Sequence, residues 1–385
     1  MAVIKSVDAK SVLDSRKEKT ILVSVKTNFG TFSASTPNGK SVGKHEVKIY
    51  KKNLEGDIKT IKDFSEYFYE ETIGKFEDLR RIEDIVDRHV GANTLFALES
   101  AVLKAVANEQ KKEVWELINP STKKSQRLVG NCIGGGKHSS EDKNPDFQEF
   151  LLIPKSKSVK EAFEINKKTK ERGGESLKES DKNFKFKKND ENAWITSMNE
   201  KDVLDILKKT KIPLGIDVAA SSFFKRKSYN YKNPLLKRTD KEQLEYLSNL
   251  IKNLDLFYIE DPFNEEDYES FSRLLKKFPD RLIVGDDLTV TNSKRLEKAI
   301  EMKSINAIIV KPNQCGSLLE VKKVCELAKE NGIKIIFSHR SGETDETILA
   351  DLAFGFGADF FKCGIDGKER EAKLKRLMEI ERGMR

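Results

Sequence analysis

Polar and charged side chains close a series of short apolar runs in the second half of the chain. They are Asp217 after Leu-Gly-Ile, Glu260 after Phe-Tyr-Ile, Asp286 after Ile-Val-Gly, Lys311 after Ile-Ile-Val, Ser338-His339-Arg340 after Ile-Ile-Phe, and Lys362 after Asp-Phe-Phe. If each run is a strand of a parallel barrel, the carboxyl ends of the strands face one shared site. These side chains would then converge there.

The residue types in this series suit a particular chemistry. Three carboxylates supply the hard oxygen ligands that Mg²⁺ prefers, and the series lacks the thiols and multiple histidines of a zinc site. A buried lysine beside a dication has a lowered pKa, because like charge disfavours its protonation. Such a lysine can act as a general base, and the metal and cationic side chains can stabilise an enolate derived from a carboxylate.

Helix capping is the competing explanation for the acidic residues. A single Asp after a strand is commonly an N-cap, and Asp261 and Asp287 each follow another acidic residue, so that either member of the pair can be the cap. Capping does not account for an ordered series of acidic and basic strand ends. We therefore favour a catalytic site.

The spacing of the runs predicts the fold that would position these side chains. The expected strands are Leu214–Asp217, Leu256–Glu260, Leu282–Asp286, Ala307–Lys311, Ile333–His339 and Asp359–Lys362. Helical patterns separate them, and this alternation indicates βα units with a parallel sheet. We expect a closed (β/α)₈ barrel; an open doubly wound sheet is the alternative.

The N-terminal part has a different pattern, typical of α+β structure. Val23–Lys26 and Thr31–Ser35 predict a hairpin, and helical periodicity follows at Leu54–Tyr69 and Ala92–Leu117. The polar segment Asn119–Gln126 contains a proline and is a natural boundary. We assign residues 1–122 to an N-terminal α+β domain and 123–385 to the barrel.

Composition excludes several classes of protein. The chain has 385 residues, 37% hydrophobic and 35% charged, and no apolar run approaches the ~18 residues of a membrane span. The start lacks the apolar stretch of a signal peptide, so we expect a cytoplasmic location. The four cysteines, none in a CxxC spacing, are expected to be reduced thiols: Cys132, Cys315, Cys325 and Cys363.

The formal net charge of +8 raises the question of nucleic-acid binding. The densest basic patch, Lys182–Lys188, contains Phe184 and Phe186, and basic residues that alternate with aromatics can bind single strands. Lysines elsewhere are interleaved with acidic residues, as in Lys167–Glu171. We interpret the charge as a solvated surface and do not expect nucleic acid as a partner.

Longer motifs resemble those of the enolase family (phosphopyruvate hydratase), in an archaeal-type or shortened form. They are Asp14-Ser-Arg16, Asn131–His138, Asp146-Phe-Gln-Glu-Phe150, Gly215–Phe224, Tyr258–Phe263, Gly285–Asn292, Lys311–Ser317 and Ser338-His-Arg-Ser-Gly-Glu-Thr344. The resemblance implies an N-terminal α+β capping domain and an enolase-type (β/α)₈ TIM-like barrel. It also implies a carbon–oxygen lyase of glycolysis and gluconeogenesis that interconverts 2-phosphoglycerate and phosphoenolpyruvate with two Mg²⁺ ions.

The resemblance also implies a role for each matching residue. Lys311 would be the base that removes the C2 proton, and Glu191 would be the acid, with Glu149 and His138 beside it. The metal ligands would be Asp217, Glu260 and Asp286, with Ser41 at a second Mg²⁺. Substrate would contact His138, Glu149, Lys311, His339, Arg340, Ser341 and Lys362.

Some positions depart from the family pattern. Asn38-Gly-Lys-Ser-Val42 places Lys40 near the second metal, and Asn192-Ala193 replaces a flexible Gly-Gly pair after Glu191. A diverged paralogue acting on another carboxylate, or a non-catalytic RNA-associated scaffold, therefore remains as an alternative. The resemblance implies a homodimer or a higher homo-oligomer, although the shortened C-terminus and Leu22 and Ser24 alter segments that would contribute to that contact.

Overall fold

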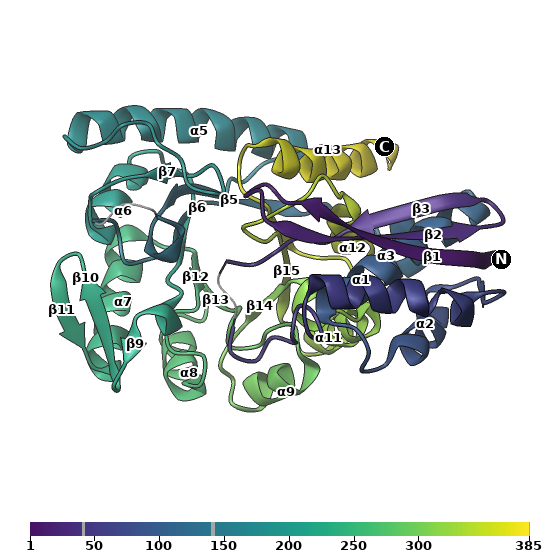
Figure 1. Cartoon of the computed structure of the whole chain (residues 1–385). Helices are drawn as coiled ribbons and strands as arrows, with labels where there is room; N and C mark the ends of the chain where they lie inside the picture. Colours follow the sequence, from purple (N-terminus) through teal and green to yellow (C-terminus); the bar gives the residue numbers. More distant parts are fainter. Residues whose placement is uncertain (41–42, 140–142, 385) are drawn as a thin grey trace.

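A computed structural model describes residues 1–40, 43–139 and 143–384. The N-terminal part is an antiparallel sheet of order β3-β2-β1-β4 covered by helices (Figure 1). Its elements are β1 (Ala2–Leu13), β2 (Lys19–Thr27), β3 (Gly30–Ser35), α1 (Leu54–Asp63), η1 (Ser65–Phe68), β4 (Thr72–Ile73), η2 (Phe76–Asp78), α2 (Leu79–Val86), α3 (Ala92–Gln110) and α4 (Val114–Ile118).

The predicted hairpin is β2 and β3, paired from Leu22–Ser35 to Thr27–Gly30. Alternate residues of β2, among them Ile21, Val23 and Val25, are buried against α3, as expected for a sheet with one covered face. The two predicted helical stretches are each divided by a break, into α1 and η1 and into α3 and α4. The sequence pattern did not predict β1, which is the longest strand of this sheet.

The second part is a closed barrel of eight strands. In spatial order they are β5 (Arg127–Gly134), β6 (Glu149–Leu152), β8 (Leu214–Asp217), β12 (Tyr258–Glu260), β13 (Leu282–Gly285), β14 (Ala307–Val310), β15 (Lys334–Ser338) and β16 (Phe360–Lys362), and β16 pairs with β5 to close it. This confirms the predicted barrel with its separate N-terminal domain, and excludes the open sheet.

One strand departs from the simple βα repeat. β6 runs antiparallel to both of its neighbours, β5 and β8, and follows β5 without an intervening long helix. Its first residue, Glu149, is therefore level with Asp217, the last residue of β8. This reversal brings Glu149 to the barrel end at which the parallel strands finish.

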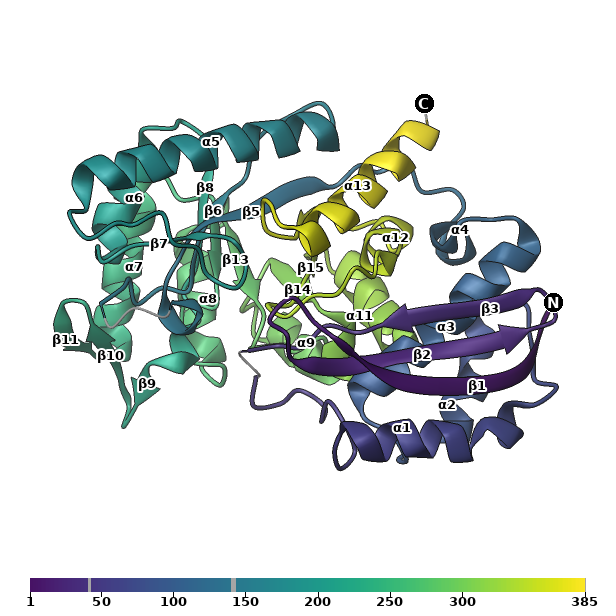
Figure 2. The same cartoon turned by 45° about the horizontal axis from the view of Figure 1, so that its top comes forward.

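Helices surround the barrel and a small sheet extends from it. The helices are η3 (Gly136–His138), α5 (Val159–Ser180), α6 (Glu200–Lys208), η4 (Ala220–Ser222), α7 (Asp240–Leu254), α8 (Tyr268–Lys277), α9 (Ser293–Glu301), α10 (Pro312–Cys315), α11 (Leu318–Glu330), α12 (Ile348–Gly355) and α13 (Lys368–Gly383). The remaining strands are β7 (Trp194–Ile195), beside β5, and the antiparallel set β9 (Phe224–Lys225), β10 (Ser228–Lys232) and β11 (Leu235–Arg238). Figure 2 shows β9–β11 and the N-terminal sheet at opposite sides of the molecule.

The barrel strands are buried on both faces. One apolar cluster fills the interior, with Val129, Leu151, Tyr258, Ile309 and Ile336 among its members, and a larger cluster lies between strands, helices and the N-terminal sheet. This explains why the strands read as continuous apolar runs. α4 ends at Ile118 and β5 begins at Arg127, so the boundary assigned at residue 122 lies between these elements and stays a prediction.

Other expectations from composition have mixed outcomes. All four cysteines are free, and Cys132, Cys325 and Cys363 are buried. Phe184 is buried and Phe186 is exposed, and both rings contact Trp194, so at least part of the basic patch is a packed segment. Among the described residues, none of the helices is long and apolar enough to cross a membrane.

Candidate active site

A polar pocket opens at the carboxyl end of the barrel strands, where the N-terminal segment Gly39–Lys40 meets them. Its described lining residues are Gly39, Lys40, His138, Gln148, Glu149, Glu191, Asp217, Ala219, Asp261, Asp286, Asp287, Lys311, Ser338, His339, Arg340, Ser341 and Lys362. Most of the residues predicted from the strand ends therefore share one pocket. Ser41, the predicted ligand of a second metal, lies outside the described residues.

Two lysines divide the predicted metal carboxylates between them. Lys362 Nζ lies 2.7 Å from both Glu260 oxygens, 3.2 Å from Asp217 Oδ2 and 3.1 Å from Glu149 Oε2. Lys311 Nζ instead pairs with Asp286 Oδ2. Glu260 does not line the pocket; it is fully buried behind Lys362 and accepts a hydrogen bond from the Tyr258 hydroxyl at 2.5 Å.

These pairings determine the charge states of the lysines. Burial lowers the pKa of each ammonium, but Asp286 more than offsets this at Lys311, and Glu149 and Glu260 do so at Lys362, so that both pKa values are raised. We expected a lowered pKa for a lysine beside a dication. While these salt bridges are formed, the pKa values of Lys311 and Lys362 are raised instead. Burial raises the pKa of Asp286, but the charge of Lys311 outweighs it and leaves that pKa lowered.

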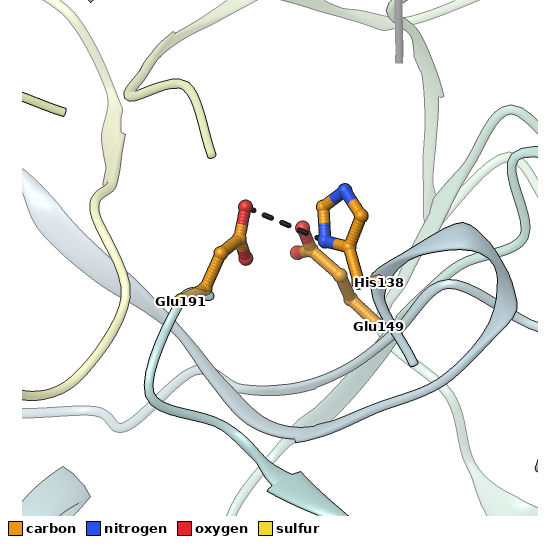
Figure 3. A group of neighbouring side chains, drawn as sticks. All are labelled: His138, Glu149 and Glu191. Atoms are coloured by element: carbon orange, nitrogen blue, oxygen red, sulfur yellow. Dashed lines mark ion pairs between the residues drawn. The ribbon is translucent and has the colours of Figure 1, made fainter. Parts of the chain in front are cut away.

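A carboxyl–imidazole group occupies another side of the pocket. Glu191 Oε1 lies 3.5 Å from His138 Nδ1 and 3.9 Å from His339 Nε2, and Glu191 Oε2 accepts from Asn131 Nδ2 at 2.9 Å. Figure 3 shows Glu191 reaching from its loop toward His138, with Glu149 beside them. Glu191 is 3% exposed, so all its polar contacts are made inside the protein.

The members of this group have opposite protonation tendencies. Burial raises the pKa of Glu149 to about 8, with Glu191 and Asp217 adding to the effect. Burial also raises the pKa of Glu191, but the imidazoles of His138 and His339 outweigh it and hold that pKa well below its usual range. The pKa of His138 is raised, because Glu191 outweighs burial, whereas burial keeps the pKa of His339 well below its usual range. Glu149 and His138 therefore favour their protonated forms, whereas Glu191 beside them favours its ionised form.

The loop that carries Glu191 is held in position by local contacts. Asn189 Oδ1 accepts from the backbone N–H groups of Glu191 and Ala193, at 3.0 and 2.9 Å. Asn192 has a φ of 63°, in the left-handed region, and Asn is among the residues that tolerate this conformation without glycine. The Asn-Ala pair thus keeps a turn in which one residue adopts a glycine-like conformation.

Arg340 and Ser341 lie where the N-terminal domain meets the barrel. Arg340 donates from Nη1 to Glu46 Oε2 at 3.0 Å and from Nη2 to Glu46 Oε1 at 3.2 Å. Ser341 Oγ accepts from the backbone N–H of Lys40 at 2.8 Å and from Arg16 Nη1 at 3.1 Å. Arg16 and Lys40 of the N-terminal domain thus meet Arg340 and Ser341 of the barrel, and these four residues form the cationic corner of the site.

Several residues of this region were missed in the sequence. Gln148 donates from Nε2 to Asp217 Oδ2 at 3.4 Å, and its place beside Glu149 in Asp146–Phe150 was the available signal. Asp261 accepts from the backbone N–H groups of Asp286 and Asp287, at 3.0 and 2.7 Å. In the sequence, the acidic pair Glu260-Asp261 indicated only a helix cap. Arg370 donates from Nη2 to the Ser341 carbonyl at 2.7 Å, and nothing in its helical pattern marked it.

The donor set fits a divalent cation. The described lining contains six carboxyl groups against four lysine or arginine side chains, so the pocket offers more carboxyl oxygens than its own cationic side chains can pair with. Burial and neighbouring carboxylates raise the pKa of Asp287 to about 8 and that of Asp261 well above its usual range. Gln148 Oε1 is also buried without a hydrogen-bond partner among the described residues. Hard oxygen donors in excess are what Mg²⁺ requires.

Among the described residues, two groups could each hold a metal ion, because the ligand atoms within each group lie within 4.8 Å of one another. One group is His138, Glu149 and Glu191, and the other is Asp261, Asp286 and Asp287. The predicted set of Asp217, Glu260 and Asp286 is not such a group, because two of its carboxylates turn to Lys362 and the third to Lys311. A metal bound by the predicted set would have to replace these ammonium contacts. The ligand assignment therefore stays a prediction.

The fold is of the TIM-barrel class, and its polar pocket lies at the carboxyl ends of the strands, where enzymes of this class have their active sites. Family models of the N-terminal domain of enolase and of the enolase C-terminal TIM barrel domain match residues 4–118 and 128–385. The chain therefore belongs to the enolase family, and it is a lyase.

Curated relatives agree over nearly the whole chain. The enolase of Picrophilus torridus is 34% identical over 402 aligned positions, which cover 98% of each chain. The enolase of Pyrobaculum aerophilum is 36% identical, over 94% of this chain and 91% of the relative. The enolase of Methanosphaera stadtmanae is 35% identical, over 99% of this chain and 97% of the relative.

Proposed function

We propose that this enzyme interconverts 2-phosphoglycerate and phosphoenolpyruvate, with Mg²⁺, in glycolysis and gluconeogenesis. The observation that carries the proposal is the composition of one pocket. It combines a lysine, Lys311, with the carboxyl–imidazole group of Glu191, His138 and Glu149, and with the cationic corner at Arg340 and Ser341. A dehydration that removes a proton from one carbon and a hydroxyl from the next needs a base and an acid.

In this reaction Lys311 accepts the proton from C2, and the C2 electron pair forms the double bond to C3. Because Glu191 favours its ionised form, it must first receive a proton from Glu149 or His138; it then passes that proton to the C3 hydroxyl, which leaves as water. Glu149 and His138 are beside Glu191 and are able to resupply its proton, because each has a raised pKa. Arg340 and Ser341 bind the phosphate and hold C2 toward the lysine, and His339 and Lys362 line the remaining wall.

Asp217, Glu260 and Asp286 would hold one Mg²⁺, with Ser41 as a ligand of the second. The ions supply positive charge that stabilises a substrate carboxylate as its charge increases during proton removal. Excess carboxylate in the pocket supports this assignment. The pKa of Lys311 is raised by its salt bridge with Asp286, so this salt bridge must open and Lys311 must lose a proton before it can act as a base.

The test follows the ultraviolet absorbance of phosphoenolpyruvate as purified protein acts on 2-phosphoglycerate with Mg²⁺. We expect turnover in the wild type and a 10²- to 10⁴-fold lower kcat in Lys311→Ala, the usual contribution of a general base. Lys294→Ala, on the exposed face of α9, is the matched control and should behave as wild type. A wild type without turnover over a wide range of Mg²⁺ concentrations would overturn the proposal.

A second measurement separates the base from the acid. Exchange of the C2 hydrogen with deuterated water requires only proton removal and return, whereas dehydration also requires loss of the hydroxyl. Lys311→Ala should lose both, and Glu191→Gln should lose dehydration while it retains exchange. Loss of exchange in Glu191→Gln, with the fold intact, would contradict the assigned roles.

Another carboxylate substrate remains the alternative, since Lys40 alters the pocket wall relative to the family pattern. A panel of hydroxy acids with and without phosphate would reveal such a preference. The expected homo-oligomer and the expected cytoplasmic location stay predictions, which light scattering and cell fractionation would check.

A further inference from the structure

Lys40 brings a flexible cation into the pocket from the N-terminal domain. Its segment is bound to the barrel by a two-way backbone bridge, in which Asn38 N–H donates to the Gly342 carbonyl at 2.7 Å and Gly342 N–H donates to the Asn38 carbonyl at 2.9 Å. The Lys40 N–H then donates to Ser341 Oγ at 2.8 Å. The backbone of Lys40 is thereby fixed beside the residues assigned to the phosphate.

Gly39 shows how closely this segment packs on the same corner. A Cβ built on Gly39 would lie 1.9 Å from Arg340 Nη2, so the Arg340 guanidinium packs directly on the backbone that precedes Lys40. The Lys40 side chain lines the pocket and is 42% exposed, with Nζ 3.6 Å from Asp190 Oδ2. This separation exceeds a hydrogen bond, so the ammonium can turn to a ligand without losing a short contact.

The charge balance of the corner leaves a role for this ammonium. Arg340 is paired through both Nη atoms with Glu46, whose side chain is 1% exposed. Arg16 pairs with Glu18 and also lies 3.9 Å from Asp14 Oδ2 and from Asp190 Oδ2, the carboxylate that faces Lys40. A phosphate monoester carries a charge of about −1.5 to −2 at neutral pH, and the charges of these two guanidinium groups are already largely balanced by the glutamates.

We propose that Lys40 is a phosphate ligand, which binds the substrate's phosphate together with Arg340 and Ser341. This proposal rests on the proposed function, since it names a further residue that holds the same substrate. Lys40 supplies positive charge for the phosphate, because the charges of Arg340 and Arg16 are partly offset by Glu46 and Glu18. The alternative is that Lys40 acts on the Glu191 loop through Asp190.

Isothermal titration calorimetry at a fixed Mg²⁺ concentration tests the proposal, with phosphoenolpyruvate and, separately, inorganic phosphate as probes. The variants are Lys40→Met and Lys40→Arg. Lys44→Met is the matched control, because Lys44 belongs to the same N-terminal segment but is exposed and does not line the pocket. Steady-state kinetics on 2-phosphoglycerate are measured in parallel.

We expect Lys40→Met to weaken binding of both probes about tenfold, the effect of losing one charge-assisted hydrogen bond. KM for 2-phosphoglycerate should rise by a similar factor with a smaller change in kcat. Lys40→Arg should retain most of the affinity, and Lys44→Met should match the wild type. Unchanged affinity of Lys40→Met for both probes would overturn the proposal, as would a lower kcat with unchanged phosphate binding.

The two proposals fail in different ways. A wild type without turnover would overturn the proposed function. The titrations with inorganic phosphate would still show whether Lys40 binds phosphate. Normal wild-type turnover with phosphate binding that does not depend on Lys40 would overturn this inference alone.

Discussion

Lys362 and Glu260 form a salt bridge inside the barrel mouth, with Lys362 Nζ 2.7 Å from both Glu260 oxygens. Lys362 ends β16 and Glu260 ends β12, and both side chains are almost fully buried. Asp217 and Glu149 lie within 3.2 Å of the same ammonium. One lysine therefore contacts carboxyl groups from three strands, and its loss should affect folding as well as binding.

Replacement of Lys362 by Met should destabilise the metal-free protein by about 3–5 kcal/mol, because it leaves buried carboxylates without their cation. Urea denaturation in EDTA measures this change. Lys329→Met, at an exposed position of α11, is the control and should shift the midpoint little. A Lys362→Met protein as stable as the wild type would show that these carboxylates take up protons at no cost.

Mg²⁺ should stabilise the folded protein, because the pocket has carboxylates in excess and the unfolded chain has no assembled site. At a concentration 100 times the Kd the gain would be about 2.7 kcal/mol, seen as a higher Tm than in EDTA. Asp286→Asn should reduce this gain, whereas Asp280→Asn, at an exposed turn, should retain it. An equal Mg²⁺ effect in both variants would contradict the assignment of Asp286.

Gly39→Ala should impair substrate binding without unfolding the protein. The added Cβ would force the Arg340 guanidinium away from its pair with Glu46. We expect KM to rise at least about tenfold, because Arg340 is one of the residues that we propose to bind the phosphate. Gly383→Ala, where a Cβ meets no atom within 4 Å, is the matched control. An unaltered KM in Gly39→Ala would mean that Arg340 moves without consequence.

Lys170 should act as a positioning residue for the acid loop. Its ammonium is buried on α5 and donates to the Asn192 carbonyl and to Asp366 Oδ1, the latter at 2.6 Å. Lys170→Met leaves the carbonyl next to Glu191 without this donor, so we expect about 1–3 kcal/mol lower stability and a lower kcat with little change in KM. Lys170→Arg should restore part of kcat. A purely structural role would lower stability and leave kcat and its pH profile unchanged.

Asp181 should contribute to the dependence of stability on pH. Its carboxylate accepts from the Thr196 hydroxyl at 2.6 Å and from the Ser197 N–H and hydroxyl, both at 2.8 Å. Burial raises the pKa of Asp181, but these hydrogen bonds outweigh it, so the folded-state pKa lies below the ordinary 3.8. The stabilisation is therefore present above pH 3.8 and is lost as the pH falls through the folded-state pKa. Asp181→Asn should lower stability at pH 7 and flatten the acid limb of a stability–pH curve; an unchanged limb would exclude this contribution.

Local patterns in the sequence were sufficient for much of the barrel. Leu214–Asp217 was predicted with the bounds of β8, and the other five predicted barrel strands differ from the observed ones by one or two residues at one or both ends. Strands buried on both faces need continuous apolar runs, and a parallel barrel gathers the residues at their carboxyl ends on one side. The types of charged residue at the carboxyl ends of the strands could therefore be predicted from the sequence, without knowledge of any side-chain contact.

Other parts of the site depend on contacts between residues that are far apart in the chain. Asn38 forms backbone hydrogen bonds with Gly342 across the domain junction. Glu149 lies at the site only because β6 runs antiparallel to its neighbours. Arg370 contacts the Ser341 carbonyl from α13, whose sequence has no catalytic pattern. The sequence determined which charges were available and which strand ends would present them. Only the tertiary structure decided which lysine pairs with which carboxylate, because those pairings depend on through-space distance and burial.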